Sequence, residues 1–420
     1  MDGALMTLGD QTALSEQYDP SRNGGGVSRR AFFGTVAATV GASSVIAPAL
    51  LGQTAGGADA AGKSAKTERA NACGDQGGKA HITSLRHKEP RLANEAGSIT
   101  HIDRSDLEVM SRLSMRRLTL APRGVREPHW HANAHELGYC LRGEHLVTIF
   151  GDHNKRNSFT ISAGEMFFVP IGALHHIENI GSQEGEIILG FSHELPEDFG
   201  LSGVFGGFTD AVLGNTVGLP ASSFQSLSRT PKDKLLGKRS TPAVIELQDR
   251  EENPYKYGLM TALPQISLAA GGAYAAKAAF WPVLQDIAMY AIHISRQGMR
   301  EIHWHPDTAE MGYVREGRGR MTIVSPGGSL DTFEMSAGDA YFVPRSYPHH
   351  IEDIGSDELQ LLVFFDQNMP GDIGMSTAVG AFSRDVIAAA FHVETAAVPD
   401  LPFKVHDDLF LPRVNALDPL

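Results

Sequence analysis

A short stretch from Arg126 to Glu136 brings two histidines and a carboxylate together at a spacing that suits metal binding. It reads Arg-Glu-Pro-His-Trp-His-Ala-Asn-Ala-His-Glu and ends at Glu136, with His129 and His131 as its His-x-His pair. On an extended strand such a pair points both imidazoles to one face, because side chains alternate with a period of two. Two nitrogens on one face and a nearby carboxylate are ligands typical of a mid-row divalent metal.

The stretch occurs a second time, and a further histidine follows each occurrence. The sequence therefore predicts two sets of metal ligands: His129, His131, Glu136 and His175 in the first, and His303, His305, Glu310 and His349 in the second. Three imidazoles and one carboxylate fill four positions of an octahedron and leave two adjacent positions open. Mixed nitrogen and oxygen ligation without thiolate favours manganese, iron or nickel over a closed structural zinc site. We expect one metal ion per set, hence two per chain.

An arginine precedes each His-x-His pair by three residues, at Arg126 and Arg300. Regular strand alternation does not aim a residue three positions away at the same face as the histidine. A guanidinium can nevertheless pair in bidentate fashion with a carboxylate, which orients a small dianion and stabilises its charge. A surface salt bridge is the other interpretation of both arginines.

The elements that must position these residues form an internal repeat. The offset is 174 residues, as from Arg126 to Arg300, and it holds without a gap from Pro90 and Pro264 to Phe208 and Phe382. Short apolar segments end at glycine or proline turns, which predicts an all-β fold of two similar domains with a few short helices. Strands are expected at 115–120, 145–150, 166–169 and 185–191, and a helical turn at 385–391. The expected ranges are 81–235 for the first domain and 236–420 for the second.

Composition limits the partners and the covalent framework. The formal net charge of −13 argues against nucleic acid or an anionic membrane as a partner. The chain has 2 cysteines, Cys73 in a glycine-rich segment and Cys140 in an expected core strand, so a disulfide framework is not predicted.

The N-terminal segment indicates export. Ser28-Arg-Arg-Ala-Phe-Phe33 precedes an apolar run from Gly34 to Leu51, and Ala58-Asp-Ala60 offers small residues for cleavage. This pattern resembles a twin-arginine signal over residues 1–60, followed by a linker over 61–80. A membrane anchor is the alternative, but the run is rich in alanine, glycine and threonine and therefore weakly apolar. The expected location is periplasmic or extracellular, with no stable membrane insertion after the signal is removed.

The two copies resemble the cupin superfamily. Its second motif is matched in full by Gly164-x5-Pro170-x-Gly172-x2-His175-x3-Asn179, and the first motif by the His-x-His and glutamate that precede it. The second copy departs at Ser346 and Asp353, which replace the motif glycine and asparagine. The resemblance implies two tandem double-stranded β-helix (jelly-roll) domains, a bicupin, and a homo-oligomer is a further expectation for such a chain.

A narrower resemblance is to bacterial oxalate decarboxylases. It is carried by Arg126-Glu-Pro-His-Trp-His131, by the corresponding stretch of the second copy, and by Asn253-Pro-Tyr-Lys-Tyr257. It implies a manganese enzyme that uses dioxygen and converts oxalate to formate and carbon dioxide, with Arg126 and Arg300 orienting the substrate and a lid glutamate acting as proton donor.

The lid segment differs from that family. Residues 193–202 read His-Glu-Leu-Pro-Glu-Asp-Phe-Gly-Leu-Ser, in which Glu197 is the nearest glutamate and Asp198 its neighbour. The counterpart of Glu197 in the second copy is Gly371. An oxalate oxidase, which would produce carbon dioxide and hydrogen peroxide, and another metal dioxygenase that acts on a different small organic acid therefore stay open as alternatives. A storage protein is disfavoured because all eight ligands are present.

Overall fold

The computed structural model describes residues 80–151, 155–242, 253–401 and 404–417. The expected export signal and most of the expected linker lie outside these residues. None of the helices in the described part of the chain has the length and hydropathy needed to span a bilayer.

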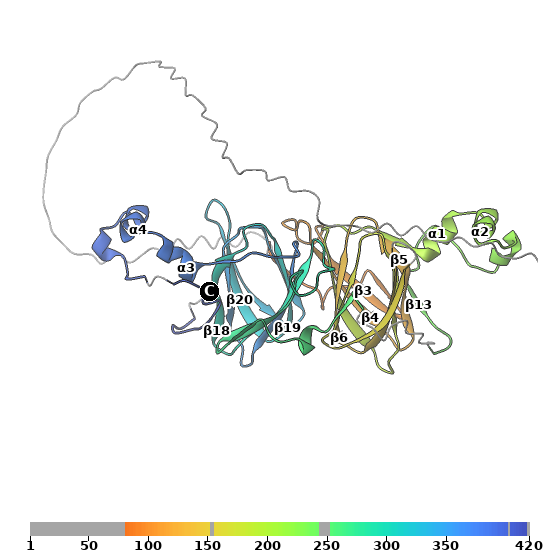
Figure 1. Cartoon of the computed structure of the whole chain (residues 1–420), viewed down its shortest axis with the longest axis horizontal. Helices are drawn as coiled ribbons and strands as arrows, with labels where there is room; N and C mark the ends of the chain where they lie inside the picture. Colours follow the sequence, from red (N-terminus) through yellow and green to blue (C-terminus); the bar gives the residue numbers. More distant parts are fainter. Residues whose placement is uncertain (1–79, 152–154, 243–252, 402–403, 418–420) are drawn as a thin grey trace, which may run out of the picture. The chain divides into compact units, whose positions relative to one another are not determined.

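The described residues form two similar β-rich copies with short helical tails, as predicted (Figure 1). The strands of the first segment are β1 Ile82–Ser84, β2 Leu92–Asn94, β3 Gly97–Ile102, β4 Ser114–Leu120, β5 Gly124–His131, β6 Glu136–Arg142, β7 Glu144–Phe150, β8 Arg156–Ser162, β9 Met166–Val169, β10 Leu174–Asn179, β11 Gly185–Phe191, β12 Asp198–Gly200 and β13 Leu236–Lys238. Those of the second are β14 Lys256–Tyr257, β15 Ile266–Leu268, β16 Gly271–Ala276, β17 Ala288–Ile294, β18 Gly298–Trp304, β19 Glu310–Glu316, β20 Arg318–Val324, β21 Leu330–Ser336, β22 Asp339–Val343, β23 His349–Asp353, β24 Leu359–Phe365, β25 Ile373–Gly374 and β26 Phe410–Pro412.

Helices follow the last long strand of each copy. The first tail holds α1 Leu201–Gly207, α2 Asp210–Val217 and the 3-10 turn η2 Ala221–Phe224, and the second holds α3 Met375–Ala378, η4 Val379–Ala381, α4 Arg384–Phe391 and η5 Thr395–Ala397. A further turn, η3, covers Leu259–Thr261. The helix expected at 385–391 is confirmed as α4, which begins after Ser383, whose side chain accepts a hydrogen bond from Val386 N.

Each copy contains two sheets. In the first copy the strand orders are β14-β9-β6-β11-β4-β3-β2 and β12-β5-β10-β7-β8, with β13 also paired to β5. The second copy has the orders β1-β22-β19-β24-β17-β16-β15 and β21-β20-β23-β18-β25, with β26 paired to β18. The paired strands are antiparallel in both copies. The sheets remain separate ladders rather than one closed barrel, an arrangement consistent with the predicted jelly roll.

The apolar strands are buried on both faces. Along β9, Met166 and Phe168 belong to a cluster shared by both copies, whereas Phe167 and Val169 belong to the interior of the first copy. Alternation is therefore present, but between two buried surfaces, which explains why this strand is apolar at every position. Cys140, in β6, is likewise buried and unpaired.

The copies exchange short strands at their junction. Ile82–Ser84 (β1) pairs with β22 of the second copy, and Lys256–Tyr257 (β14) pairs with β9 of the first. A buried carboxylate, Asp366, adds a polar contact there: it accepts from Arg112 Nε at 2.9 Å and from Arg345 Nη2 at 2.6 Å. Thr308 Oγ1 donates to its other oxygen at 2.6 Å. Strand β13 begins at Leu236, the first residue assigned by sequence to the second domain, yet it pairs with β5 of the first.

Candidate metal and substrate site

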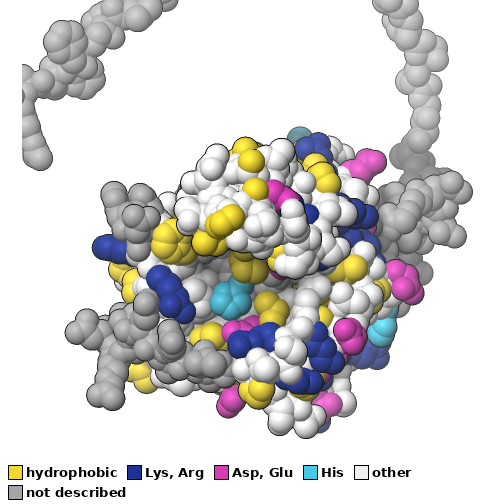
Figure 2. All heavy atoms as spheres, turned by 90° about the vertical axis from the view of Figure 1, so that its right-hand side faces the viewer, with side chains coloured by type: hydrophobic (Ala, Val, Ile, Leu, Met, Phe, Trp, Pro, Cys, Tyr) yellow, Lys and Arg dark blue, Asp and Glu magenta, His cyan; other side chains and the backbone are white. Residues whose placement is uncertain are grey.

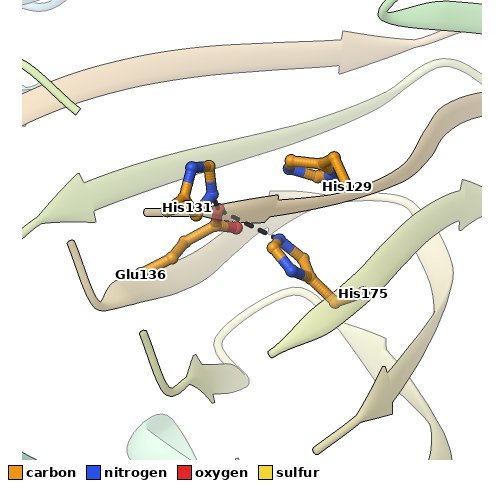
Figure 3. A group of neighbouring side chains, drawn as sticks. All are labelled: His129, His131, Glu136 and His175. Atoms are coloured by element: carbon orange, nitrogen blue, oxygen red, sulfur yellow. Dashed lines mark hydrogen bonds and ion pairs between the residues drawn. The ribbon is translucent and has the colours of Figure 1, made fainter. Parts of the chain in front are cut away.

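The first predicted ligand set lies together inside the first copy (Figure 3). His129 and His131 come from β5, Glu136 from the start of β6 and His175 from β10, and all four side chains are buried. One candidate ligand atom from each lies within 4.8 Å of the others. Glu136 Oε2 is 2.7 Å from His131 Nε2 and 3.3 Å from His175 Nε2. Strands β5 and β10, which are neighbours in one sheet, and strand β6 of the other sheet thus bring four candidate ligand atoms to one point.

The second ligand set has the same arrangement. His303 comes from β18, His305 follows that strand directly, Glu310 begins β19 and His349 begins β23. Glu310 Oε2 is 2.9 Å from His305 Nε2 and 3.3 Å from His349 Nε2. The four side chains are buried, and their candidate ligand atoms also lie within 4.8 Å of one another.

Hydrogen bonds at Nδ1 determine which ring nitrogen of each histidine faces the centre. Five rings contact a backbone carbonyl through Nδ1, at 2.7 to 2.9 Å, and the sixth, His131, contacts Asp198 Oδ1 at 2.8 Å. An oxygen acceptor requires Nδ1 to carry the proton, so Nε2 of a neutral ring presents a lone pair. These lone pairs face a carboxylate, and lone pairs and carboxylate repel one another unless a cation lies between them. The donor set therefore fits a metal ion in each copy.

The charge states of His129, His303 and Glu136 agree with this fit. For His131 and His305, burial lowers the pKa, but hydrogen bonds with carboxylates outweigh burial and raise it. Burial, followed by the charge of Arg126, holds the pKa of His129 well below its ordinary value. His303 behaves in the same way beside Arg300. Burial opposes ionisation of Glu136, but His175 and the hydrogen bond with His131 outweigh it and lower the pKa of this carboxyl. Neutral imidazole and ionised carboxylate are the forms that bind a metal.

A bulge in β5 brings Arg126 to the metal-facing side of the strand. In the pairing of β10 with β5, His175 lies opposite His129 but Ile177 lies opposite Arg126, so β5 contains one extra residue between the two pairs. The extra residue reverses the alternation, and Arg126 is buried on the same side as His129 and His131. The same shift occurs in the second copy between Arg300 and His303. Regular alternation could not predict either placement.

Asp198 connects the arginine to the ligand group. Its Oδ2 accepts from Arg126 Nη2 at 2.9 Å and from Arg116 Nη1 at 2.6 Å, while Oδ1 accepts from His131 Nδ1. Burial opposes its ionisation, but Arg116 and His131 outweigh it and hold the pKa of this carboxyl far below its ordinary value. The guanidinium of Arg116 also lies 4.5 Å from the ring centroid of Phe191. Sequence analysis did not identify Arg116 as a site residue. A signal was present, because the equivalent residue of the second copy is Tyr290 and the repeat is therefore broken at this position.

The second copy lacks this carboxylate bridge. His305 Nδ1 contacts the carbonyl of Gly371 at 2.8 Å, and Asp372, the counterpart of Asp198, pairs with Arg300. The side chain of Asp372 is 33% exposed, against 16% for Asp198. A carboxylate bonded to a metal-binding imidazole makes that imidazole more basic than a carbonyl does. The two sites therefore differ in their surroundings although their ligands are alike.

Glu197, the predicted lid acid, lies on the surface. Its backbone N donates to Asn133 Oδ1 at 2.9 Å, and its side chain lines a cavity of about 200 Å³ together with Arg91, His101, Arg116 and Pro196. It is not among the buried ligand group. Asp198, not Glu197, makes the contacts to the metal-facing side chains, and the proton-donor role of Glu197 stays a prediction.

Comparison with known proteins supports the fold and the ligand pattern. The profile of the cupin family matches residues 83–222 and 257–398, which is more than half of the chain. The chain belongs to the cupin family. Both halves of this cupin protein match separately, which agrees with the two ligand sets. The two copies predicted from the repeat, and the bicupin that the resemblance implies, are thereby confirmed.

The two relatives described next match more than half of this chain, and both are named as oxalate decarboxylases. The cupin chain is 28% identical over 281 residues to an oxalate decarboxylase of Bacillus subtilis, covering 64% of this chain and 71% of that protein. It is 26% identical over 306 residues to a probable oxalate decarboxylase of Arthroderma benhamiae, covering 70% and 75%. A wheat (Triticum aestivum) oxalate oxidase is 38% identical, but over 87 residues that cover 20% and 39%.

The structural comparison shows the same fold. The solved structure of an oxalate decarboxylase from Bacillus subtilis at pH 4.6 matches with a TM-score of 0.70 and 24% sequence identity, covering 80% of this chain and 89% of that one. The predicted resemblance to bacterial oxalate decarboxylases is confirmed, and the chain has two buried His/Glu groups that fit two metal ions.

Proposed function

We propose that this protein is a manganese-dependent oxalate decarboxylase that converts oxalate to formate and carbon dioxide. The observation that carries the proposal is the burial of Arg126 on the same strand face as His129 and His131. A cation fixed beside a metal-binding group is what a small dicarboxylate requires. The names of the relatives that match most of the chain point to the same substrate.

Arg126 is the residue that orients the substrate. Its guanidinium is buried and can hold one carboxylate of oxalate in a fixed direction. Because water is excluded from this position, the charge interaction is stronger there than in bulk water. A bound manganese would supply a Lewis acid and a redox centre for the other end of the substrate. The ligand chemistry, nitrogen and oxygen without sulfur, suits manganese; iron and nickel are the alternatives.

Decarboxylation also needs a proton at the carbon that loses carbon dioxide. Oxalate monoanion carries that proton on a carboxyl group, and the products formate and carbon dioxide require its transfer to carbon. Asp198 is a poor donor because Arg116 and His131 stabilise its ionised form. Glu197, one residue away and exposed, is the donor that we assign, and it reaches the substrate by movement of the segment before β12.

The first copy is the site that we assign to the reaction. Glu197 has Gly371 as its counterpart, and the second copy therefore lacks a carboxylate at this position. Arg300 would hold an anion in the second copy by the same contact as Arg126, but without a glutamate at the position of Glu197.

Oxalate oxidase is the second candidate, favoured by the exposed position of Glu197. Without a proton delivered to carbon, dioxygen would take two electrons from the oxalate dianion and, with uptake of two protons, the products would be two carbon dioxide and one hydrogen peroxide. The experiment uses the chain from Ala61, loaded with manganese and given oxalate and air at mildly acid pH, with formate and peroxide quantified together. About one formate per oxalate supports decarboxylation, and peroxide without formate supports the oxidase.

The variant Glu197→Gln separates the two further. It should lower formate production by about 100-fold, within the range typical of a positioned general acid, and leave the metal content unchanged. Glu184→Gln is the matched control, because this exposed glutamate pairs with Arg142 at the surface. Metal-loaded protein that yields neither product would refute oxalate as the substrate.

We also propose export by the twin-arginine route into the periplasm or beyond. The pattern around Arg29 and Arg30 supports it. Replacing both arginines with lysine should keep the protein in the cytoplasm, and fractionation of cells would show it. Undiminished export of the double variant would refute the proposal.

A further inference from the structure

The glutamate ligand of the second copy has a hydrogen bond that its counterpart lacks. Tyr341 Oη donates to Glu310 Oε1 at 2.7 Å, and the other oxygen of this carboxylate, Oε2, faces the histidines. In the first copy Phe167 replaces the tyrosine. Glu136 Oε1 is buried there and has no hydrogen-bond partner among the described residues.

The two aromatic rings occupy equivalent places, so the difference is confined to one hydroxyl group. Gly312 lies opposite Tyr341 in the pairing of β19 with β22, and Gly138 lies opposite Phe167 in that of β6 with β9. A Cβ atom on Gly312 would lie 2.1 Å from Tyr341 Cζ, and one on Gly138 would lie 2.3 Å from Phe167 Cζ. Each ring therefore packs directly against the glycine opposite it, in space that a Cβ atom would fill. The absence of a side chain at this glycine leaves room for the ring beside the glutamate ligand of its copy.

We propose that Tyr341 is a positioning residue for the metal ion of the second copy and makes the two metal sites unequal. Its hydroxyl occupies Oε1 of Glu310 and fixes the carboxylate with Oε2 toward the three histidines. The carboxylate of Glu136 has no such restraint. The second site consequently holds its metal more firmly than it would with phenylalanine, by the effect that outer hydrogen bonds have on ligand orientation.

A reciprocal exchange tests this proposal. His129→Ala leaves the second site as the metal site, and Tyr341→Phe is made in that background. His303→Ala leaves the first site, and Phe167→Tyr is made there. Manganese affinity is measured by competition with a chelator, and the Mn(II) electron paramagnetic resonance spectrum reports the ligand surroundings. Neither measurement needs the substrate, so the result is independent of the proposed decarboxylation.

We expect Tyr341→Phe to weaken manganese binding at the second site by about 10- to 100-fold and to change its spectrum. Phe167→Tyr should strengthen binding at the first site and shift that spectrum toward the one of the second site. Tyr313→Phe is the matched control: Tyr313 is buried in the same strand as Glu310 but contacts Arg86, and its loss should leave both measurements unchanged.

A cooperative thermal unfolding transition of each metal-free variant confirms that the variant has folded. An affinity within about two-fold of the parent and an unchanged spectrum for Tyr341→Phe would overturn the proposal, since outer-ligand effects are larger. If Tyr341→Phe fails to fold, Phe167→Tyr decides alone, and an unchanged affinity there would overturn it. A change of equal size in Tyr313→Phe would also overturn it, because the effect would then belong to packing.

Discussion

Replacement of Asp198 by asparagine should destabilise the metal-free protein strongly. Asp198 Oδ2 is shared by Arg116 and Arg126, whose side chains are 9% and 4% exposed. Asparagine keeps an acceptor for His131 Nδ1 but leaves two buried guanidinium groups without a counter-charge. Removal of one partner of a buried ion pair lowers the free energy of unfolding by about 3 to 5 kcal/mol. Because Asp198 is 16% exposed and solvent screens part of the interaction, we expect a loss of about 3 kcal/mol.

The corresponding change in the second copy, Asp372→Asn, is the matched control. Asp372 pairs with a single arginine and its side chain is 33% exposed, so its loss should cost about 1 kcal/mol or less. Thermal unfolding of chelator-treated protein measures the difference. At about 2 to 4 °C per kcal/mol for a domain of this size, Asp198→Asn should lower the midpoint by about 6 to 12 °C.

Acid should remove the same contribution from the parent protein. The pKa of Asp198 is depressed on folding, so its ionised form stabilises the native state above the ordinary value of 3.8, and this stabilisation is lost as the pH falls below that value. The midpoint of Asp198→Asn should therefore fall less than that of the parent as the pH is lowered from ~4 to ~2, whereas the two should respond alike between neutral pH and ~4. Equal shifts for Asp198→Asn and Asp372→Asn, or an unchanged pH dependence, would refute the assignment of the bridge.

Three further outcomes are expected. His129→Ala should reduce the metal content from two ions per chain to one, measured by elemental analysis of dialysed protein, because each copy has its own buried group of four candidate ligands. In a Cys73→Ser background, Cys140 should resist thiol reagents until the protein unfolds, since burial raises the pKa of this thiol to about 12. Asp366→Ala should destabilise the protein by about 2 kcal/mol more than the exposed-site control Glu184→Gln, mainly because the buried Thr308 hydroxyl loses its acceptor. The two arginines contribute less, since their side chains are 49% and 39% exposed.

Each of these has a contrary result. Full metal content in His129→Ala would mean that three ligands suffice. Rapid labelling of Cys140 in the native state would mean that the interior of the first copy opens. A midpoint for Asp366→Ala equal to that of its control would mean that the junction does not depend on this carboxylate.

The repeated motif allowed the ligands and the strands to be predicted because both depend on local pattern. The expected strand at 166–169 is β9, and the one at 185–191 is β11. Strand alternation directs His176 and His350 away from the neighbouring ligands His175 and His349, and they contact Glu178 and Glu352. On the face drawn in Figure 2 acidic and basic side chains are interspersed.

The remainder depends on contacts between distant segments. The bulge that turns Arg126 inward appears only when β5 is paired with β10. Asp198 is 82 residues from Arg116, and no local rule predicts that they meet. The exposure of Glu197 depends likewise on how Asn133 holds the segment before β12. The differences between copies, Arg116 against Tyr290 and Tyr341 against Phe167, were visible in the repeat but acquired meaning only from the geometry.

The exchanged strands at the junction have a consequence for attempts to divide the protein. A fragment that ends near residue 242 would keep β1 without β22, its partner, and would expose the edge of β9 that β14 covers. Unpaired edges of this kind recruit other strands. Half of this protein should therefore be recovered as an aggregate or as a pair of halves that exchange strands with each other. Neither half keeps all of its strand partners, because β1 pairs with β22 and β14 with β9.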